Sequence, residues 1–233
     1  MIQSLPTRDT WAEAAADRLA GALAEALTAN GRALFAGSGG STPSPIYARL
    51  AQADLDWTKV TATLVDERYV PEASPASNAA LLKQTLLTGP AAAVRFIPLY
   101  SPAVTVDRAA ALASQALAAE RRPLDAVLLG MGEDGHICSM FPGSPTLTTL
   151  LTPSLKPAVY GVPAGRDGAA PPQERLTLNL PWLVTARCVV LALTGAKKRA
   201  VFEREAAGDP AVSPIAALIA ANAPLEVIWT EAD

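Results

Sequence analysis

The single histidine of the chain, His136, is the first residue to consider for proton transfer. It ends the segment Gly130-Met131-Gly132-Glu133-Asp134-Gly135-His136, which follows an apolar, strand-like run. Imidazole, with a reference pKa near ~6.5, exchanges protons readily at neutral pH. A lone histidine is more often packed or solvated than catalytic, but open α/β sheets place ligand sites in segments that follow a buried strand. We therefore expect His136 to carry chemistry, with Asp134 either orienting it or serving only the turn.

A second segment has the composition of an anion-binding loop. Residues 37–45 read Gly-Ser-Gly-Gly-Ser-Thr-Pro-Ser-Pro between a strand-like and a helix-like run. Glycines let backbone N–H groups approach a ligand, Ser41 and Thr42 add hydroxyl donors, and a helix start favours negative charge. A flexible turn explains the loop equally well when it is taken alone. Thr42 at the third glycine position and the lack of Gly-Lys-Ser/Thr disfavour a nucleotide site, so Gly40 and Ser41 are candidate phosphate contacts.

Three basic residues are candidates for binding the same anion. Arg68 closes the triplet Asp66-Glu67-Arg68 at the end of a strand-like run, and its guanidinium can bind a phosphate through two hydrogen bonds. Asp66 or Glu67 can orient that arginine or accept a sugar hydroxyl, although a solvated charge cluster is equally compatible with the pattern. Arg175 begins another strand-like stretch, and Lys198 follows Lys197 at a strand-to-helix junction. Each of these later residues is also compatible with a surface charge.

Length, composition and charge favour a cytoplasmic protein with a small anionic substrate. The 233 residues are 50% hydrophobic, which suits one large α/β domain over residues 1–233. A formal charge of −3 without Lys/Arg blocks disfavours nucleic acids and anionic membranes as partners. Cys138 and Cys188 form no disulfide framework, which favours a reducing compartment. We expect neither an export signal nor a membrane span, since no apolar run approaches ~18 residues.

Apolar runs alternate with Ala/Leu-rich runs, and this order predicts a mostly parallel sheet with helices on both faces. We expect strands at residues 33–36, 61–65, 126–129, 159–162, 175–180, 188–193 and 225–229. We expect a first helix that is capped by Thr10 and Glu13 and runs to Asn30, and further helices at residues 45–53, 79–87, 107–120, 196–207 and 212–221. The Pro/Gly-rich residues 163–172 are expected to form a surface loop or lid rather than a domain boundary.

Several stretches taken together resemble the 6-phosphogluconolactonase family in their order and intervals. They are, in chain order, Gly39-Gly40-Ser41-Thr42-Pro43, Asp66-Glu67-Arg68 with Ser77-Asn78, the segment ending in His136 with Ser139-Met140-Phe141-Pro142, Arg175, and Gly195 to Lys198. The resemblance implies a three-layer α/β/α sandwich with a modified Rossmann-like sheet, related to glucosamine-6-phosphate deaminases and ribose-5-phosphate isomerases. It also implies hydrolysis of 6-phospho-D-glucono-1,5-lactone to 6-phospho-D-gluconate in the oxidative pentose phosphate pathway, with no metal or organic cofactor.

The resemblance assigns roles to the candidate residues. It implies that His136 is the general base, and that Arg68, Arg175 and Lys198 bind the phosphate with help from Gly40 and Ser41. Asp134 and Asp66 are then expected beside the base and beside the substrate. The chain departs from the family at Ile137-Cys138, where members often have Thr-Ala, and at Leu178-Asn179. These departures affect the expected pocket shape but none of the proposed groups. The sequence leaves open whether the chain is a monomer or a small homo-oligomer.

Two other functions are compatible with parts of the pattern. The related amino-sugar phosphate deaminases share the glycine-rich loop and the Asp-Gly-His turn, but they typically continue with Phe-Asn-Glu-Pro. This chain has Phe141-Pro142-Gly143-Ser144 and so lacks the carboxylate that an isomerising deaminase needs for its additional proton transfers. A non-catalytic sugar-phosphate sensor would keep the basic residues and need no base, and the presence of His136 disfavours it.

Overall fold

The central element of the fold is a seven-stranded sheet whose paired neighbours all run parallel. A computed structural model describes residues 2–40, 42–103, 105–165 and 172–232. Across the sheet the strands are β1 (Ile2–Leu5), β10 (Leu225–Thr230), β9 (Val189–Thr194), β6 (Ala126–Leu129), β2 (Ala33–Gly37), β3 (Val60–Leu64) and β5 (Arg95–Phe96). Strands β2, β3, β6 and β9 are buried at every position, as expected for a sheet covered on both faces.

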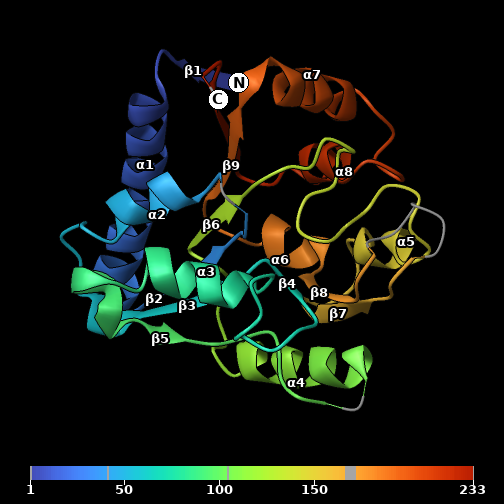
Figure 1. Cartoon of the computed structure of the whole chain (residues 1–233), viewed down its shortest axis with the longest axis horizontal. Helices are drawn as coiled ribbons and strands as arrows, with labels where there is room; N and C mark the ends of the chain where they lie inside the picture. Colours follow the sequence, from blue (N-terminus) through green and yellow to red (C-terminus); the bar gives the residue numbers. More distant parts are fainter. Residues whose placement is uncertain (1, 41, 104, 166–171, 233) are drawn as a thin grey trace.

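Helices cover both faces of this sheet (Figure 1). They are α1 (Arg8–Asn30), α2 (Ser44–Leu50), α3 (Asn78–Thr85), α4 (Val106–Ala118), α5 (Leu147–Leu150), α6 (Leu180–Val184), α7 (Gly195–Ala206) and α8 (Pro214–Ala220), with 3-10 turns at Trp57–Lys59 and Gly89–Ala93. Helix α1 packs on β1, β2, β6, β9 and β10, and α7 and α8 lie on the other side. This arrangement confirms the predicted α/β/α sandwich. Among the described helices, none has the length and apolarity needed to cross a bilayer.

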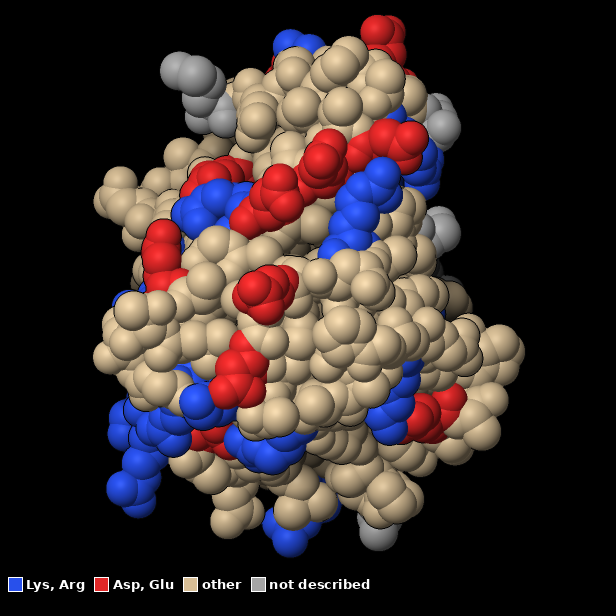
Figure 2. All heavy atoms as spheres, turned by 90° about the vertical axis from the view of Figure 1, so that its left-hand side faces the viewer, with Lys and Arg blue, Asp and Glu red and all other residues tan. Residues whose placement is uncertain are grey.

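Helix α1 is fixed to the sheet by one apolar stripe. Trp11, Ala15, Leu19 and Leu23 recur at helical spacing and are completely buried. The indole N–H of Trp11 donates to the carbonyl of Ile228 at 3.1 Å, so the buried ring also satisfies its polar group. The opposite face of α1 is polar: Figure 2 shows acidic and basic side chains interleaved over this side of the molecule.

A smaller antiparallel sheet stands beside the large one. It consists of β4 (Asp66–Arg68), β8 (Arg175–Leu178) and β7 (Val159–Val162), in the order β4-β8-β7, and α4 packs on β7 and β8. The chain leaves the large sheet at Val65, whose carbonyl accepts from the N–H of Leu178 at 2.9 Å. The charged triplet is therefore a strand of its own, paired with β8, rather than the end of β3.

Some expected boundaries are wrong. Helix α1 begins one turn early because Thr7, not Thr10, is its N-cap: the Thr7 hydroxyl accepts from the N–H of Thr10 at 3.2 Å. The expected strand at 175–180 ends at Leu178, since Leu180 and Pro181 open α6. Strands β1 and β5 and helices α5 and α6 were not expected, because runs of two to five residues carry too little periodicity. Of the expected loop at 163–172, residues 166–171 lie outside the described part of the chain.

A buried carboxylate joins β4 to α3. Glu67 is 0% exposed, and its Oε1 accepts from the N–H groups of Arg68 and Asn78, both at 2.7 Å. Its Oε2 accepts from the N–H of Ala79 at 2.8 Å and from the hydroxyl of Ser77 at 3.0 Å. Burial raises the pKa of Glu67, and the three backbone donors oppose that rise. Glu67 thus binds the free N–H groups at the start of α3 and holds the neighbouring Arg68 in place.

We expect Glu67→Gln to lower the free energy of unfolding by about 1–3 kcal/mol or more, because the amide nitrogen would face N–H groups that need an acceptor. Urea denaturation of the variant and the wild type measures this difference. Glu72→Gln is the matched control: Glu72 is half exposed and pairs with Lys83 at the surface, and the substitution should change stability by less than about 1 kcal/mol. Equal effects of the two substitutions would contradict the proposed role of Glu67.

Candidate active site

A cavity of about 280 Å³ lies where the carboxyl ends of β2 and β6 face the small sheet. Its volume is near the lower end of the ~300–1,000 Å³ typical of small-molecule sites. The structure brings together most of the predicted residues, since the cavity is lined by Gly40, Asp66, Arg68, His136, Arg175 and Lys198. Asp134 is not among the lining residues, but it contacts the lining residue His136. Ser41 lies outside the described residues.

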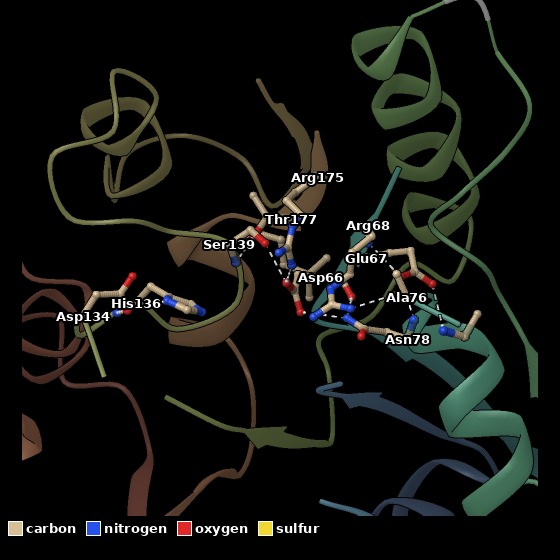
Figure 3. Close-up of polar contacts among 12 residues, drawn as sticks. Asp66, Glu67, Arg68, Ala76, Asn78, Asp134, His136, Ser139, Arg175 and Thr177 are labelled. Atoms are coloured by element: carbon tan, nitrogen blue, oxygen red, sulfur yellow. Dashed lines mark hydrogen bonds and ion pairs between the residues drawn. The ribbon is translucent and has the colours of Figure 1, made fainter. Parts of the chain in front are cut away.

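His136 and Asp134 form a hydrogen-bonded pair (Figure 3). Asp134 Oδ1 is 2.5 Å from His136 Nδ1 and also accepts from the His136 backbone N–H at 3.2 Å. The hydrogen bond from His136 lowers the pKa of Asp134, so this carboxyl is ionised at neutral pH. An ionised carboxylate only accepts hydrogen bonds, so Asp134 favours the imidazole tautomer that carries its proton on Nδ1, and in that tautomer the Nε2 lone pair can take a proton.

The turn that carries this pair requires a glycine at position 132. A Cβ on Gly132 would collide with His136 Nδ1 and Asp134 Oδ1. The Gly132 N–H also donates to the carbonyl of His136 at 2.9 Å, which closes the turn. On its other side, the imidazole packs on Phe141 with ring centroids 4.3 Å apart. The imidazole is therefore held by a carboxylate, a tight turn and an aromatic ring.

Two arginines lie on neighbouring strands of the small sheet. Arg68 on β4 pairs directly with Arg175 on β8, an arrangement in which like charges repel. Arg68 Nη1 donates to the carbonyl of Ala76 at 2.6 Å, whereas the Nε atoms of both arginines are buried and have no hydrogen-bond partner among the described residues. Burial lowers the pKa of Arg175, Asp66 opposes this effect, and Arg68 adds to it. Two guanidinium groups with spare donors and little compensating charge favour an anionic ligand.

Asp66 connects this arginine pair to the segment that follows His136. Its Oδ2 accepts from the hydroxyl of Ser139 at 2.6 Å and lies 3.9 Å from Arg175 Nη1. The Ser139 N–H in turn donates to Thr177 Oγ1 at 3.1 Å (Figure 3). Asn78 Nδ2 donates to the carbonyl of Asp66 at 3.0 Å. Asp66, the carboxylate expected beside the substrate, thus also connects β4 to the segment after His136 and to α3.

The structure distinguishes the two adjacent lysines. Lys198, in the first turn of α7, lines the cavity. Lys197 is largely exposed and pairs with Glu133 instead. Lys198 is therefore the lysine placed to contact a bound anion.

Ser38 and Cys138 are among the cavity residues that were not singled out as ligand contacts from the sequence. Ser38 is 6% exposed, and its hydroxyl has no hydrogen-bond partner within the described ranges. Cys138 adopts a left-handed backbone with φ of 52°, and burial raises the pKa of its thiol, which is therefore neutral. Ser38 lies in the glycine-rich loop, so the loop composition carried a signal for it. For Cys138, the only signal in the sequence was the departure from the family pattern at Ile137-Cys138, which was expected to affect the shape of the pocket.

Comparison with known proteins places these features in one family. The family model described as glucosamine-6-phosphate isomerases/6-phosphogluconolactonase matches residues 6–229. A 6-phosphogluconolactonase of Rhizobium meliloti (strain 1021) is 44% identical over 220 residues, which cover 94% of this chain and 93% of that protein. One of Caulobacter vibrioides is 39% identical over 231 residues, which cover 99% and 97%.

A solved structure agrees with these sequence matches. The crystal structure of a 6-phosphogluconolactonase from Shewanella baltica OS155 superposes with a TM-score of 0.90 at 33% identity, covering 99% of this chain and 97% of that one. The chain therefore belongs to the glucosamine-6-phosphate isomerase/6-phosphogluconolactonase family, and within it to the 6-phosphogluconolactonases.

Proposed function

We propose that the chain hydrolyses 6-phospho-D-glucono-1,5-lactone to 6-phospho-D-gluconate, the lactonase step of the oxidative pentose phosphate pathway, with His136 as the general base. The observation that carries this proposal is that one cavity is lined both by a histidine that is hydrogen-bonded to a carboxylate and by two partly buried arginines whose Nε atoms have no partner among the described residues. The first supplies a base for water, and the second supplies a site for phosphate. The relatives named as 6-phosphogluconolactonases support the same reaction.

In the proposed reaction, Nε2 of neutral His136 takes a proton from water while the water oxygen bonds to the lactone carbonyl carbon. The carbonyl electron pair moves to its oxygen and forms a tetrahedral oxyanion. As that oxyanion collapses, the bond from carbon to the ring oxygen breaks, and the imidazolium returns its proton to the departing oxygen. Asp134 stabilises the imidazolium through Nδ1. A positioned base of this kind contributes roughly 10²–10⁴ in rate.

The phosphate is proposed to bind on the other side of the cavity. Arg68, Arg175 and Lys198 supply the charged donors, and Gly40 and Ser41 are predicted to add contacts from the loop after β2. Holding the phosphate fixes the distance of the carbonyl carbon from the water at His136, which reduces the entropic cost of the attack. The Ser38 hydroxyl, which has no partner among the described residues, and backbone N–H groups of the loop after β2 are proposed to stabilise the oxyanion, because the N–H groups of Gly132 and Gly135 already donate within their turn.

The structure gives less support to the two alternatives. Residues 141–144 carry no carboxylate beside His136, so an isomerising deaminase lacks the additional acid it needs. A sensor needs no base, yet the turn at Gly132 is built around the His136–Asp134 contact. A cytoplasmic location, catalysis without metal or cofactor, and a monomeric or small oligomeric state remain predictions from the sequence.

We expect His136→Ala to lower kcat for 6-phosphogluconolactone by about 10²–10⁴, with a small change in KM, because the base acts mainly in the transition state. Asp134→Asn should lower kcat less, since it removes only the charge that supports the imidazolium. The assay uses lactone freshly generated by oxidation of glucose 6-phosphate, with the uncatalysed hydrolysis subtracted.

Ammonia release from glucosamine 6-phosphate is measured in parallel with the histidine variant. Wild-type kcat retained in His136→Ala would exclude His136 as the base. Ammonia release without lactone hydrolysis would instead indicate a deaminase, and neither activity in the wild type would indicate a binding protein.

Arg175→Gln should raise KM for the phosphorylated lactone by about tenfold or more, because a charge-assisted contact to phosphate is lost. The rate constant at low concentration of unphosphorylated glucono-1,5-lactone should change little. Arg108→Gln, at an exposed site on α4, controls for the loss of one positive charge. Equal losses for both lactones would show that Arg175 does not recognise the phosphate.

A further inference from the structure

A second cavity lies at the opposite ends of the strands from the active site. Its volume is about 390 Å³, and it is lined by Asn30, Arg32, Arg121, Arg122, Pro123 and Arg187. These residues come from the segments that lead into β2, β6 and β9, whereas the active site uses segments that follow β2 and β6. The two cavities are therefore separated by the length of the parallel sheet, and no function considered above uses the second one.

The buried carboxylate of Asp125 compensates only part of the positive charge of these arginines. Asp125 is 0% exposed, and its Oδ2 accepts from the Leu34 N–H at 2.7 Å and from Arg122 Nη2 at 2.5 Å. Arg187 Nε lies 3.2 Å from Asp125 Oδ1. A buried carboxylate is commonly neutralised by one guanidinium, and Arg122 already provides it. Arg187, which is 53% exposed, is an additional charge at the same position.

Arg122 is held rigidly and still has unused donors. Its side chain is only 9% exposed, and its Nη1 donates to the carbonyl of Arg32 at 2.7 Å. Its Nε is buried without a hydrogen-bond partner in the part of the chain that the structure describes. A guanidinium fixed in this way loses little conformational freedom when it binds a further acceptor.

The charges in the second cavity do not balance. Four arginines line it, and no Asp or Glu is among the lining residues; Asp125 lies buried behind them. Helices α1 and α4 end near Asn30 and Arg121, and each helix C-terminus contributes roughly half a negative charge. The acid next to Arg121 in the chain, Glu120, is paired with Arg95. About two positive charges therefore remain without compensation. Basic side chains also gather at the lower left of Figure 2, the end of the molecule toward which α1 runs in Figure 1.

We propose that Arg32, Arg121, Arg122 and Arg187 form a second anion-binding site, which takes a diphosphate group, free or carried on a small molecule. Guanidinium groups bind phosphate oxygens through paired hydrogen bonds, and several of them around one cavity match an anion with more than one charged centre. A bound diphosphate supplies the negative charge that the cluster lacks. It also relieves the repulsion among the four arginines, whose charge Asp125 compensates only in part.

Isothermal titration of the whole chain with inorganic pyrophosphate, in a buffer free of phosphate and sulfate, tests this site. We expect binding that weakens by about tenfold or more in Arg32→Gln and in Arg187→Gln, because each loses a charged donor. Both residues are exposed, so the variants should fold, which thermal melting checks. Arg108→Gln, which removes one charge from the exposed surface of α4, should bind as the wild type does. Titration with ADP in parallel distinguishes a free diphosphate from one carried on a nucleoside.

Pyrophosphate can also bind in the active site, so the titration is repeated with Arg68→Gln, which should weaken binding at that site. The proposal requires that a binding event survive in Arg68→Gln and be weakened by the second-cavity substitutions. Binding lost in Arg68→Gln but retained in Arg32→Gln and Arg187→Gln would place pyrophosphate in the active site and overturn the proposal. So would the absence of heat for both pyrophosphate and ADP with the wild type, or equal weakening in Arg108→Gln.

Discussion

The pairing of β4 with β8 is the constraint on which the candidate site depends. Its register sets Arg68 opposite Arg175, and like charges at such positions repel, so the strands must be held by other contacts. Glu67 supplies one of these contacts by accepting the N–H groups at the start of α3 together with that of Arg68. Asp66 supplies another by placing a negative charge close to Arg175. The repulsion that remains is what an anionic ligand can relieve.

The proposed base and the two arginines proposed to bind the phosphate are positioned by two different sheets. His136 follows β6 of the large sheet, and the arginines belong to the small sheet. Their relative position matters because a phosphate held by the arginines determines where the lactone carbonyl lies with respect to the base. Ser139 connects the segment after His136 to the small sheet, since its hydroxyl donates to Asp66 and its N–H donates to Thr177. A short loop with two buried hydrogen bonds thus sets the spacing between the base and the phosphate site.

The sequence predicted those parts of the structure that follow from local patterns. The periodic burial of Trp11, Ala15 and Leu19, and the buried strands, specify a helix-covered parallel sheet. The turn ending in His136 was recognisable because its glycines and acids directly follow β6. The register of Arg68 against Arg175 was not predictable, because it depends on a three-residue strand pairing with a distant segment. The role of Glu67 was not predictable either. From the sequence, Ser77-Asn78 is sufficiently explained as a helix cap, and only the fold brings the Glu67 carboxylate into contact with these two residues.

A crystal structure of the chain with 6-phosphogluconate bound would show whether the arginines hold the phosphate and whether the reacting carbon lies at His136. We predict phosphate oxygens at about 2.7–2.9 Å from nitrogens of Arg68 and Arg175, the spacing of charge-assisted hydrogen bonds. We also predict that the carboxylate carbon formed from the lactone carbonyl lies on the His136 side of the cavity, with its oxygens within reach of Nε2. A phosphate beside His136, or a product bound without contact to either arginine, would show that the proposed roles of the arginines and of His136 are wrong.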